Sequence, residues 1–383
     1  MTGHERNTVA PGLAGFAAAA DSLSVVPIDP VADARWDAFV REHPDAGPYH
    51  LGAWAEILRA AYGDRPAYMA LQSPEGEVVG GLPLVGTRGL LTGRRMRSLP
   101  VVPPAGPLAP HEDGVRALIE AACRLTDDRG ARVWTLHART GGYEELVPEL
   151  RPLPKHPTWI LELPADADEL RAGWKKTSNN LWRSLRKADR AGVTVREASS
   201  EHDLRAFYAL YLRTMRRRST LPRPYRQLRE DRRLLGPSGA FRLFVAEHEG
   251  DIVAAGVYHA LGDGVDLLYN GSDDSRLDVR PNHALYWHVI EWAAAAGYAH
   301  MDFGHARPGS SLAGFKAQWS AREVPEYRYD YVPGAAGGVA ASPRASVGRA
   351  LEGRARQGRL ERVWQHLPLP LTRLAAGVAH RYL

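Results

Sequence analysis

The sequence predicts an α/β (α+β) protein in which one α-β-β-α-β unit occurs twice, so that two tandem domains carry mixed sheets flanked by helices. Three observations lead to this prediction. The chain has 383 residues, which is too long for one ordinary core. A glycine-turn hairpin pattern occurs twice, and the same helix–strand pattern follows each copy. The shared order of the four matched elements argues against chance similarity.

The repeated hairpin is the first of these elements. Residues 68–81 (YMALQSPEGEVVGG) and 243–255 (LFVAEHEGDIVAA) share a β-rich run, a turn, then glycine, an acidic residue and two β-branched residues. Gly76 corresponds to Gly250 in this alignment. Two strands around a tight glycine turn are typical of a β-hairpin.

Helical patterns surround both hairpins. Residues 54–63 and 204–219 are expected to form a helix before each one. Residues 115–138 and 285–306 each show an apolar-periodic helix, a glycine stop and then a buried strand. From these elements we expect a disordered N-terminus (1–22), a first domain (23–164), a second domain with a basic linker helix (165–333) and an arginine-rich helical tail (334–383).

Composition indicates where such a protein works. Cys123 is the single cysteine, which excludes an internal disulfide and suits a reducing cytosol. No apolar run reaches 18 residues, so a cytoplasmic protein is expected. The net charge of +5 comes mainly from one segment, because residues 344–383 contain eight arginines and only two acidic residues, Glu352 and Glu361. This amphipathic tail suits an anionic membrane surface or RNA, or alternatively packs against the body.

The linker helix within residues 169–193 is the densest basic segment. Between positions 171 and 190, seven Lys or Arg side chains are opposed by one acidic residue, Asp189, and Lys176, Arg183 and Arg186 project away from the apolar side of the helix. Like charges at this density repel one another unless a polyanion neutralises them. These three residues are therefore candidates for binding phosphates, with a solvated surface helix as the alternative.

The segment MDFGHARPGSSLAGFKAQWS (301–320) contains the candidate catalytic residues. Lys316 follows Phe315 in aromatic surroundings after a glycine-containing loop, so it either snorkels to water or faces an anion. Asp302 ends a buried strand and is a further candidate. The MDFG string is not the kinase metal motif, because no His-Arg-Asp catalytic loop accompanies it. As a surface lysine, Lys316 is expected to contribute little to stability.

Three arginines and two tyrosines complete the candidate set. Arg216, Arg217 and Arg218 lie at a helix end, where they either complement the helix dipole or bind a substrate's phosphates. Tyr258 and Tyr269 are expected on strands of the second domain, where they either line a groove or pack in the core.

The duplicated unit resembles the FemABX aminoacyltransferases, which carry two tandem GNAT-like domains. The resemblance covers roughly residues 48–332, and its most specific piece is GYAHMDFGHARPGSSLAGFKAQW, with the Phe-Lys pair. It implies transfer of an amino acid from aminoacyl-tRNA to an amine acceptor on a cell-wall (peptidoglycan) peptide precursor or a natural-product peptide. Pro110 stands where relatives often carry an aspartate considered as a base, which leaves the identity of a base open.

This chemistry agrees with the residue types. Aminolysis of an activated ester passes through an oxyanion that a cation stabilises, so neither a metal nor a nucleophilic side chain is expected. Lys316 would serve there, or would anchor the terminal phosphate. The strongest alternative donor is acetyl-CoA or another acyl-CoA, yet no pyrophosphate loop of the GNAT type occurs, RTGGYE (139–144) being the nearest string. A non-catalytic RNA- or glycan-precursor-binding module is a second alternative.

Overall fold

The computed structural model describes residues 23–334 except 90–91, 100–102 and 178. The predictions for residues 1–22 and for the arginine-rich tail lie outside this range, apart from Gly334.

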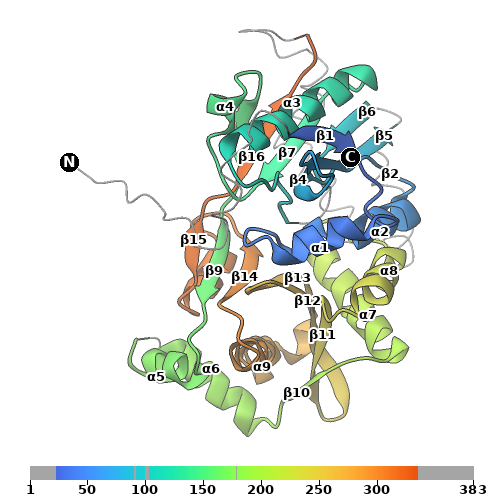
Figure 1. Cartoon of the computed structure of the whole chain (residues 1–383). Helices are drawn as coiled ribbons and strands as arrows, with labels where there is room; N and C mark the ends of the chain where they lie inside the picture. Colours follow the sequence, from blue (N-terminus) through green and yellow to red (C-terminus); the bar gives the residue numbers. More distant parts are fainter. Residues whose placement is uncertain (1–22, 90–91, 100–102, 178, 335–383) are drawn as a thin grey trace, which may run out of the picture.

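The first half of the chain contains the predicted helix, hairpin, helix and strand in the predicted order (Figure 1). Its elements are β1 (Ser24–Pro27), α1 (Ala34–Glu42), the short 3-10 helix η2 (Pro48–His50), α2 (Ala53–Tyr62), β2 (Arg65–Pro66), β3 (Met69–Gln72), β4 (Val78–Leu82), β5 (Val85–Gly89), β6 (Gly93–Arg97), α3 (Glu112–Asp128), β7 (Trp134–Ala138), α4 (Tyr143–Leu146), β8 (Arg151–Leu153) and β9 (Thr158–Glu162).

The second half repeats this order after two helices that hold the basic linker segment. Its elements are α5 (Ala167–Thr177), α6 (Asn179–Arg190), β10 (Thr194–Glu197), α7 (Glu201–Arg217), α8 (Tyr225–Leu235), β11 (Phe241–His248), β12 (Asp251–Leu261), β13 (Gly264–Ser272), the 3-10 helix η3 (Asp274–Val279), α9 (Pro281–Ala295), β14 (His300–His305), α10 (Ser311–Ala317), β15 (Arg322–Val324) and β16 (Tyr327–Tyr331).

Both predicted hairpins are confirmed. Strands β3 and β4 pair antiparallel, as do β11 and β12. The corresponding turn glycines have nearly the same left-handed backbone, with φ of 84° at Gly76 and 86° at Gly250. Such φ values strain residues that carry a Cβ, which explains glycine at both turns.

The two halves exchange strands. The second-half sheet has the order β10-β11-β12-β13-β14-β9-β15, so β9 from the first half lies inside it. The first-half sheet has the order β2-β5-β6-β7-β16-β8, so β16 from the end of the second half lies inside that one. Strands β1, β3 and β4 form a separate three-stranded sheet. Each half therefore supplies an internal strand to the other's sheet.

The halves also share a hydrophobic core. One cluster joins Trp36 and Trp54 of the first half to Phe207, Leu228 and other buried residues of the second. Helices α2 and α8 pack together across this boundary (Figure 1). Separate cores lie beneath α3 in the first half and beneath α9 in the second. The boundary between the halves is thus packed like a protein interior.

In the second half, β13 and β14 run parallel and pair only from Gly264 to Asp266 and from His300 to Asp302. Beyond Asp302, β14 leaves β13 while still pairing with β9. The residues just after this divergence carry the candidate site.

None of the helices in the described part of the chain combines the length and the apolar composition needed to cross a membrane.

We expect a fragment covering residues 165–383 to be much less stable than one covering 154–383, although they differ by only 11 residues. The longer fragment keeps β9, whereas the shorter one leaves the hydrogen-bonding edges of β14 and β15 unpaired. Urea unfolding followed by circular dichroism measures both fragments. Equal unfolding midpoints would show that the exchanged strand contributes nothing to the second half.

In the intact chain, circular dichroism and tryptophan fluorescence should report one coincident transition, because the halves share strands and a core. Two separated transitions would contradict this expectation.

Candidate active site

Lys316 is buried rather than exposed. Only 2% of the residue is accessible, and its ammonium group donates hydrogen bonds to the carbonyl oxygens of Gly304 at 2.6 Å and His305 at 2.9 Å. Burial lowers the pKa of Lys316 to about 8, against the opposing effect of Asp302 and with a smaller lowering from Arg218. The expectation of a snorkelling surface lysine is therefore wrong. Lys316 instead holds the end of β14, where that strand leaves β13.

Asp302 lies at the divergence of β13 and β14 and is 3% exposed. Its carboxylate accepts hydrogen bonds from the Thr158 hydroxyl and, at 2.7 Å, from the backbone N–H of Gly304. It also pairs with Arg139 at 3.0 Å. Asp302 thus connects the end of β14 with an arginine from the other half of the chain.

Arg139 joins two buried aspartates across the boundary between the halves. It follows β7, and it pairs with Asp302 on β14 and with Asp266 on β13, the latter at 3.3 Å. Although burial alone lowers the pKa of Arg139, these two carboxylates raise it above its ordinary value. Burial raises the pKa of Asp266 to about 7, against the lowering effect of Arg139. Sequence reasoning missed Arg139 and Asp266 as site residues.

A second ionic cluster lies where the chain crosses between the sheets. Glu326, just before β16, pairs with Lys155 at 2.5 Å and with His305 at the end of β14. Burial by itself raises the pKa of Glu326, but His305 and Lys155 together have the larger effect and lower that pKa to about 2. Because the Lys316 ammonium binds the His305 carbonyl, this cluster shares a strand end with Lys316.

A cationic cavity of about 570 Å³, here called cavity 2, lies between α6, α9 and α10. Phe315 lines it together with Arg183 and Lys187 of α6, and with Arg280 and His283 at the start of α9. Burial lowers the pKa of His283 to about 4. None of the described residues that line cavity 2 is a carboxylate. The structure therefore brings together Phe315 and Arg183, which the sequence proposed separately.

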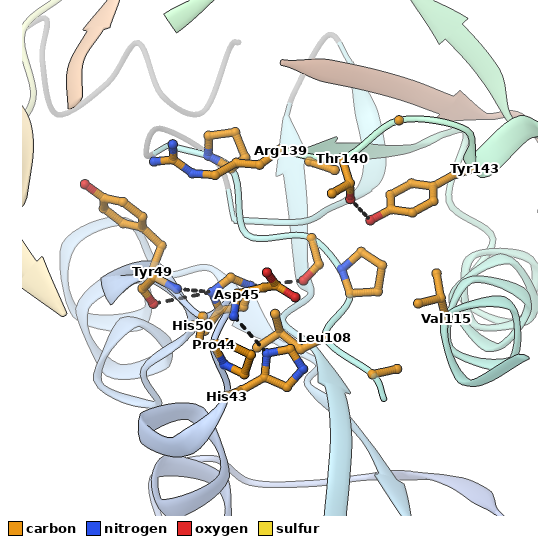
Figure 2. Close-up of a pocket in the computed structure, with 18 of the residues that line it drawn as sticks. His43, Pro44, Asp45, Tyr49, His50, Leu108, Val115, Arg139, Thr140 and Tyr143 are labelled. Atoms are coloured by element: carbon orange, nitrogen blue, oxygen red, sulfur yellow. Dashed lines mark hydrogen bonds between the residues drawn. The ribbon is translucent and has the colours of Figure 1, made fainter. Parts of the chain in front are cut away.

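A larger cavity of about 780 Å³, here called cavity 1, lies in the first half and reaches the second (Figure 2). Arg139, Tyr49 and Asp45 line it from the first half, and Asp266 and His300 line it from the second. Arg139 and Asp266 of this lining form an ion pair with each other, and Arg139 also pairs with Asp302. Of the predicted catalytic residues, Phe315 lines cavity 2 and Asp302 pairs with an arginine of cavity 1, whereas Lys316 and Asp302 themselves line neither cavity.

The remaining basic candidates are distributed around these cavities. Lys176 and Arg186 are exposed on the linker helices and line none of the cavities described here. Arg216 lies in the last turn of α7, and Arg217, which ends that helix, pairs with Asp274. Arg218 is exposed at the C-cap of α7 and acts electrostatically on Lys316. Arg218 thus connects this run of arginines electrostatically with the candidate site.

The two strand tyrosines lie in cores. Tyr258 is fully buried and packs against Phe244. Tyr269 is 8% exposed, and its hydroxyl accepts a hydrogen bond from Gln227 at 3.0 Å. In this structure both rings serve packing, and a part in substrate binding stays a prediction.

Replacing Lys316 by Met should lower the free energy of unfolding by about 1–3 kcal/mol at pH 7, because two carbonyl oxygens lose a charged donor. The difference in the free energy of unfolding between the parent and the variant should widen between pH 8 and pH 10.5. In that window the unfolded lysine still binds a proton that the folded one has released, so stability of the parent rises with pH. Denaturant titrations across this range measure the effect.

The exposed Lys176→Met variant is the matched control and should follow the parent at every pH. An equally stable Lys316→Met variant would mean that the ammonium does not hold the strand end.

Comparisons with known proteins agree with this architecture. Residues 175–317 match the model described as the acetyltransferase (GNAT) domain. The structure of FemX superposes with a TM-score of 0.66 at 17% identity, covering 81% of this chain and 97% of FemX. No curated protein sequence matched the chain.

Two further solved structures are similar. The C-terminal domain of a putative lysylphosphatidylglycerol synthetase from Agrobacterium fabrum has a TM-score of 0.54 at 14% identity, covering 83% of this chain and 94% of that one. A tandem GNAT protein from the clavulanic acid biosynthesis pathway has a TM-score of 0.50 at 14% identity, covering 82% and 100%. The match to the GNAT-domain model supports an acyltransferase of the GNAT type. The solved structures show that the chain has the tandem GNAT fold of FemABX-type proteins that the resemblance predicted.

Proposed function

We propose that the chain is an aminoacyltransferase of FemABX type, which transfers an aminoacyl group from aminoacyl-tRNA to an amine acceptor. Cavity 2 is the observation that carries this proposal. It joins three cations, Arg183, Lys187 and Arg280, to an aromatic ring, Phe315, and the described residues around it include no opposing carboxylate. Phosphates bind cations, and nucleobases stack on aromatic rings, so the end of a tRNA suits both features.

The start of α9 adds to the attraction for phosphate. This helix begins at Pro281, and Arg280 is its N-cap residue. The helix dipole places partial positive charge at this end, where an anion is favoured. Cavity 2 therefore combines side-chain cations with a helix terminus of the same sign.

In the proposed reaction, the acceptor nitrogen attacks the carbonyl carbon of the ester. The new C–N bond forms first and gives a tetrahedral intermediate. Its collapse breaks the C–O bond to the ribose, and the nitrogen's proton passes to the departing ribose oxygen. An ammonium group has three N–H donors, of which Lys316 uses two on Gly304 and His305. We assign the third to the oxyanion of the tetrahedral intermediate, where such a donor is most effective.

Asp302 serves this proposal as a positioning residue. Its bonds to Thr158 and Gly304 fix the strand end that Lys316 also binds, and its ion pair fixes Arg139 at the edge of cavity 1. It thereby links the strand end that Lys316 binds to the edge of cavity 1.

An acyl-CoA donor is the second candidate. It is favoured by the GNAT domain model, whose matched residues 175–317 include nearly all of cavity 2. The pyrophosphate of CoA would use the same cations. The absence of the GNAT pyrophosphate motif from the sequence weighs against it.

The donor is tested by incubating the protein with a mixture of charged tRNAs, or with acetyl-CoA, and adding candidate amines. We expect acyl loss from charged tRNA, abolished by ribonuclease, and none from acetyl-CoA. Activity that needs a CoA thioester and survives ribonuclease would identify the second candidate. Binding of tRNA without acyl loss from either donor would indicate a non-catalytic binding module.

Binding of tRNA should also depend on cavity 2. The Arg183→Gln/Lys187→Gln variant should reduce the slope of log K against log salt by about 0.7–0.9 for each lost phosphate contact. Arg226→Gln, an exposed arginine on α8, is the matched control and should leave the slope unchanged. Identical slopes for both variants would remove cavity 2 from the donor site.

For Lys316→Met, we expect kcat to fall by about 10²–10³ with little change in KM for the tRNA, as on removal of one oxyanion donor. Assays run well below the variant's melting temperature separate this loss from unfolding. A raised KM with normal kcat would instead assign Lys316 to phosphate binding.

A further inference from the structure

The two cavities differ in charge, and this difference points to the chemistry of the acceptor. We propose that cavity 1 binds a small acceptor carrying more than one positive charge, of the diamine or polyamine class, rather than a phosphate-linked precursor. The term acceptor rests on the proposed function, whereas the binding of a polycation by cavity 1 does not.

Carboxylates dominate the charged lining of cavity 1. Asp45, Glu112, Glu145 and Asp263 are exposed around it, and Asp266 lies buried at its inner side. These five acidic groups come from four separate segments of the chain: the loop after α1, the start of α3, α4, and strand β13 with the turn before it. The fold thus gathers negative charge from both halves around one hollow.

The cations available to an anionic ligand are few. Among the described residues that line cavity 1, Arg139 is the only arginine or lysine, and it is already paired with Asp266 and Asp302. Four histidines also line it: His43, His50, His111 and His300. Burial lowers the pKa of His43, and it lowers that of His50 to about 4, so His50 is uncharged near neutral pH. His300 lies 3.8 Å from the carboxylate of Asp263. A phosphate entering this cavity would be repelled by the carboxylates of the lining. To bind the guanidinium of Arg139, it would have to displace Asp266 or Asp302.

A buried hydroxyl lies beside the inner carboxylate of cavity 1. Tyr49 lines the cavity and is only 1% exposed, and its hydroxyl interacts with the Asp266 carboxylate as a hydrogen-bond donor, which lowers the pKa of Asp266 against the effect of burial. A donor aimed at a carboxylate favours its charged form, so Tyr49 helps to keep negative charge at the inner side of the cavity. Figure 2 shows the Tyr49 hydroxyl and the Arg139 side chain on the same side of the cavity.

The wall that carries Tyr49 is rigid. The indole N–H of Trp36 donates to the carbonyl of His50 at 2.8 Å, and that of Trp54 donates to the carbonyl of Pro48 at 3.0 Å. The His50 ring also bonds to the carbonyl of Gly106 at 3.1 Å. Because these anchors fix the segment, Tyr49 is held in place before any ligand binds. A volume of about 780 Å³ suits a small molecule.

The opposite charges of the two cavities suit the two substrates of one transfer. An ammonium group of the acceptor releases a proton to solvent to become nucleophilic, while its other cationic groups remain bound to the carboxylates. Its nitrogen then forms the amide bond, the ester C–O bond breaks, and a second proton moves to the ribose oxygen. No oxidant, reductant or further reactant is required.

The test is a calorimetric titration of the full chain with spermidine at low ionic strength, without any donor. We expect saturable binding that weakens as salt is raised. The Asp45→Asn/Glu145→Gln variant should weaken it about 10-fold, because both side chains are exposed at cavity 1 and their loss should leave the fold intact.

The matched control removes the same two charges elsewhere. Glu75→Gln/Glu77→Gln changes exposed residues at the β3–β4 turn and should bind spermidine as the parent does. Equal weakening in both variants would show that spermidine senses net charge alone, and no binding by the parent would equally overturn the proposal.

A transfer assay separates this inference from the proposed function. Spermidine binding that depends on cavity 1, without acyl transfer from charged tRNA, would support the cavity's preference and reject the aminoacyltransferase. Transfer from charged tRNA to a uridine diphosphate-linked amine, with spermidine inert, would support the aminoacyltransferase and overturn the polyamine preference.

Discussion

The exchange of internal strands between the halves constrains everything else in this structure. Strand β9 is hydrogen-bonded on both sides within the second sheet, and β16 is likewise internal in the first. An internal strand cannot leave without exposing two rows of backbone groups, which is far more costly than losing an edge. The relative position of the two halves is therefore fixed by backbone hydrogen bonds as well as by the shared apolar core.

The crossing region is also where charge is buried. Arg139 meets Asp266 and Asp302 there, and Lys155 meets Glu326 nearby. Desolvating such groups costs several kcal/mol per ion, and an apolar replacement is often as stable. Stability alone therefore gives no reason to keep these ions, whereas the proposed reaction between two substrates would. Perturbed ionisable groups beside a cavity are typical of functional sites.

The division of charge between the cavities gives the molecule a polarity suited to joining unlike substrates. Cavity 2 presents Arg183, Lys187 and Arg280, and cavity 1 presents mainly carboxylates. Electrostatic complementarity contributes to selectivity by rejecting ligands of the wrong sign as much as by attracting the right one. A polyphosphate donor and a cationic acceptor would each be disfavoured in the other's cavity.

The sequence by itself determined the local elements. The paired hairpins, their turn glycines and the helices beside them follow from periodicity and from the φ values that only glycine adopts easily, and these depend on neighbours along the chain. The adjacent Phe315 and Lys316 also pointed to a segment that borders cavity 2, although their catalytic role stays a prediction. The basic linker helix was predicted from charge density, and Arg183 indeed lines the same cavity as Phe315.

Only the tertiary structure decided which residues meet. Arg139 contacts Asp266 across 127 positions of sequence, and no periodic pattern encodes such a contact. The same holds for the burial of Lys316, because the carbonyls of Gly304 and His305 that bind it come from a strand end placed by β9. Tyr258 and Tyr269 face cores rather than a groove for a related reason: alternation along a strand gives two faces, and only the packing of the second sheet decides what covers each.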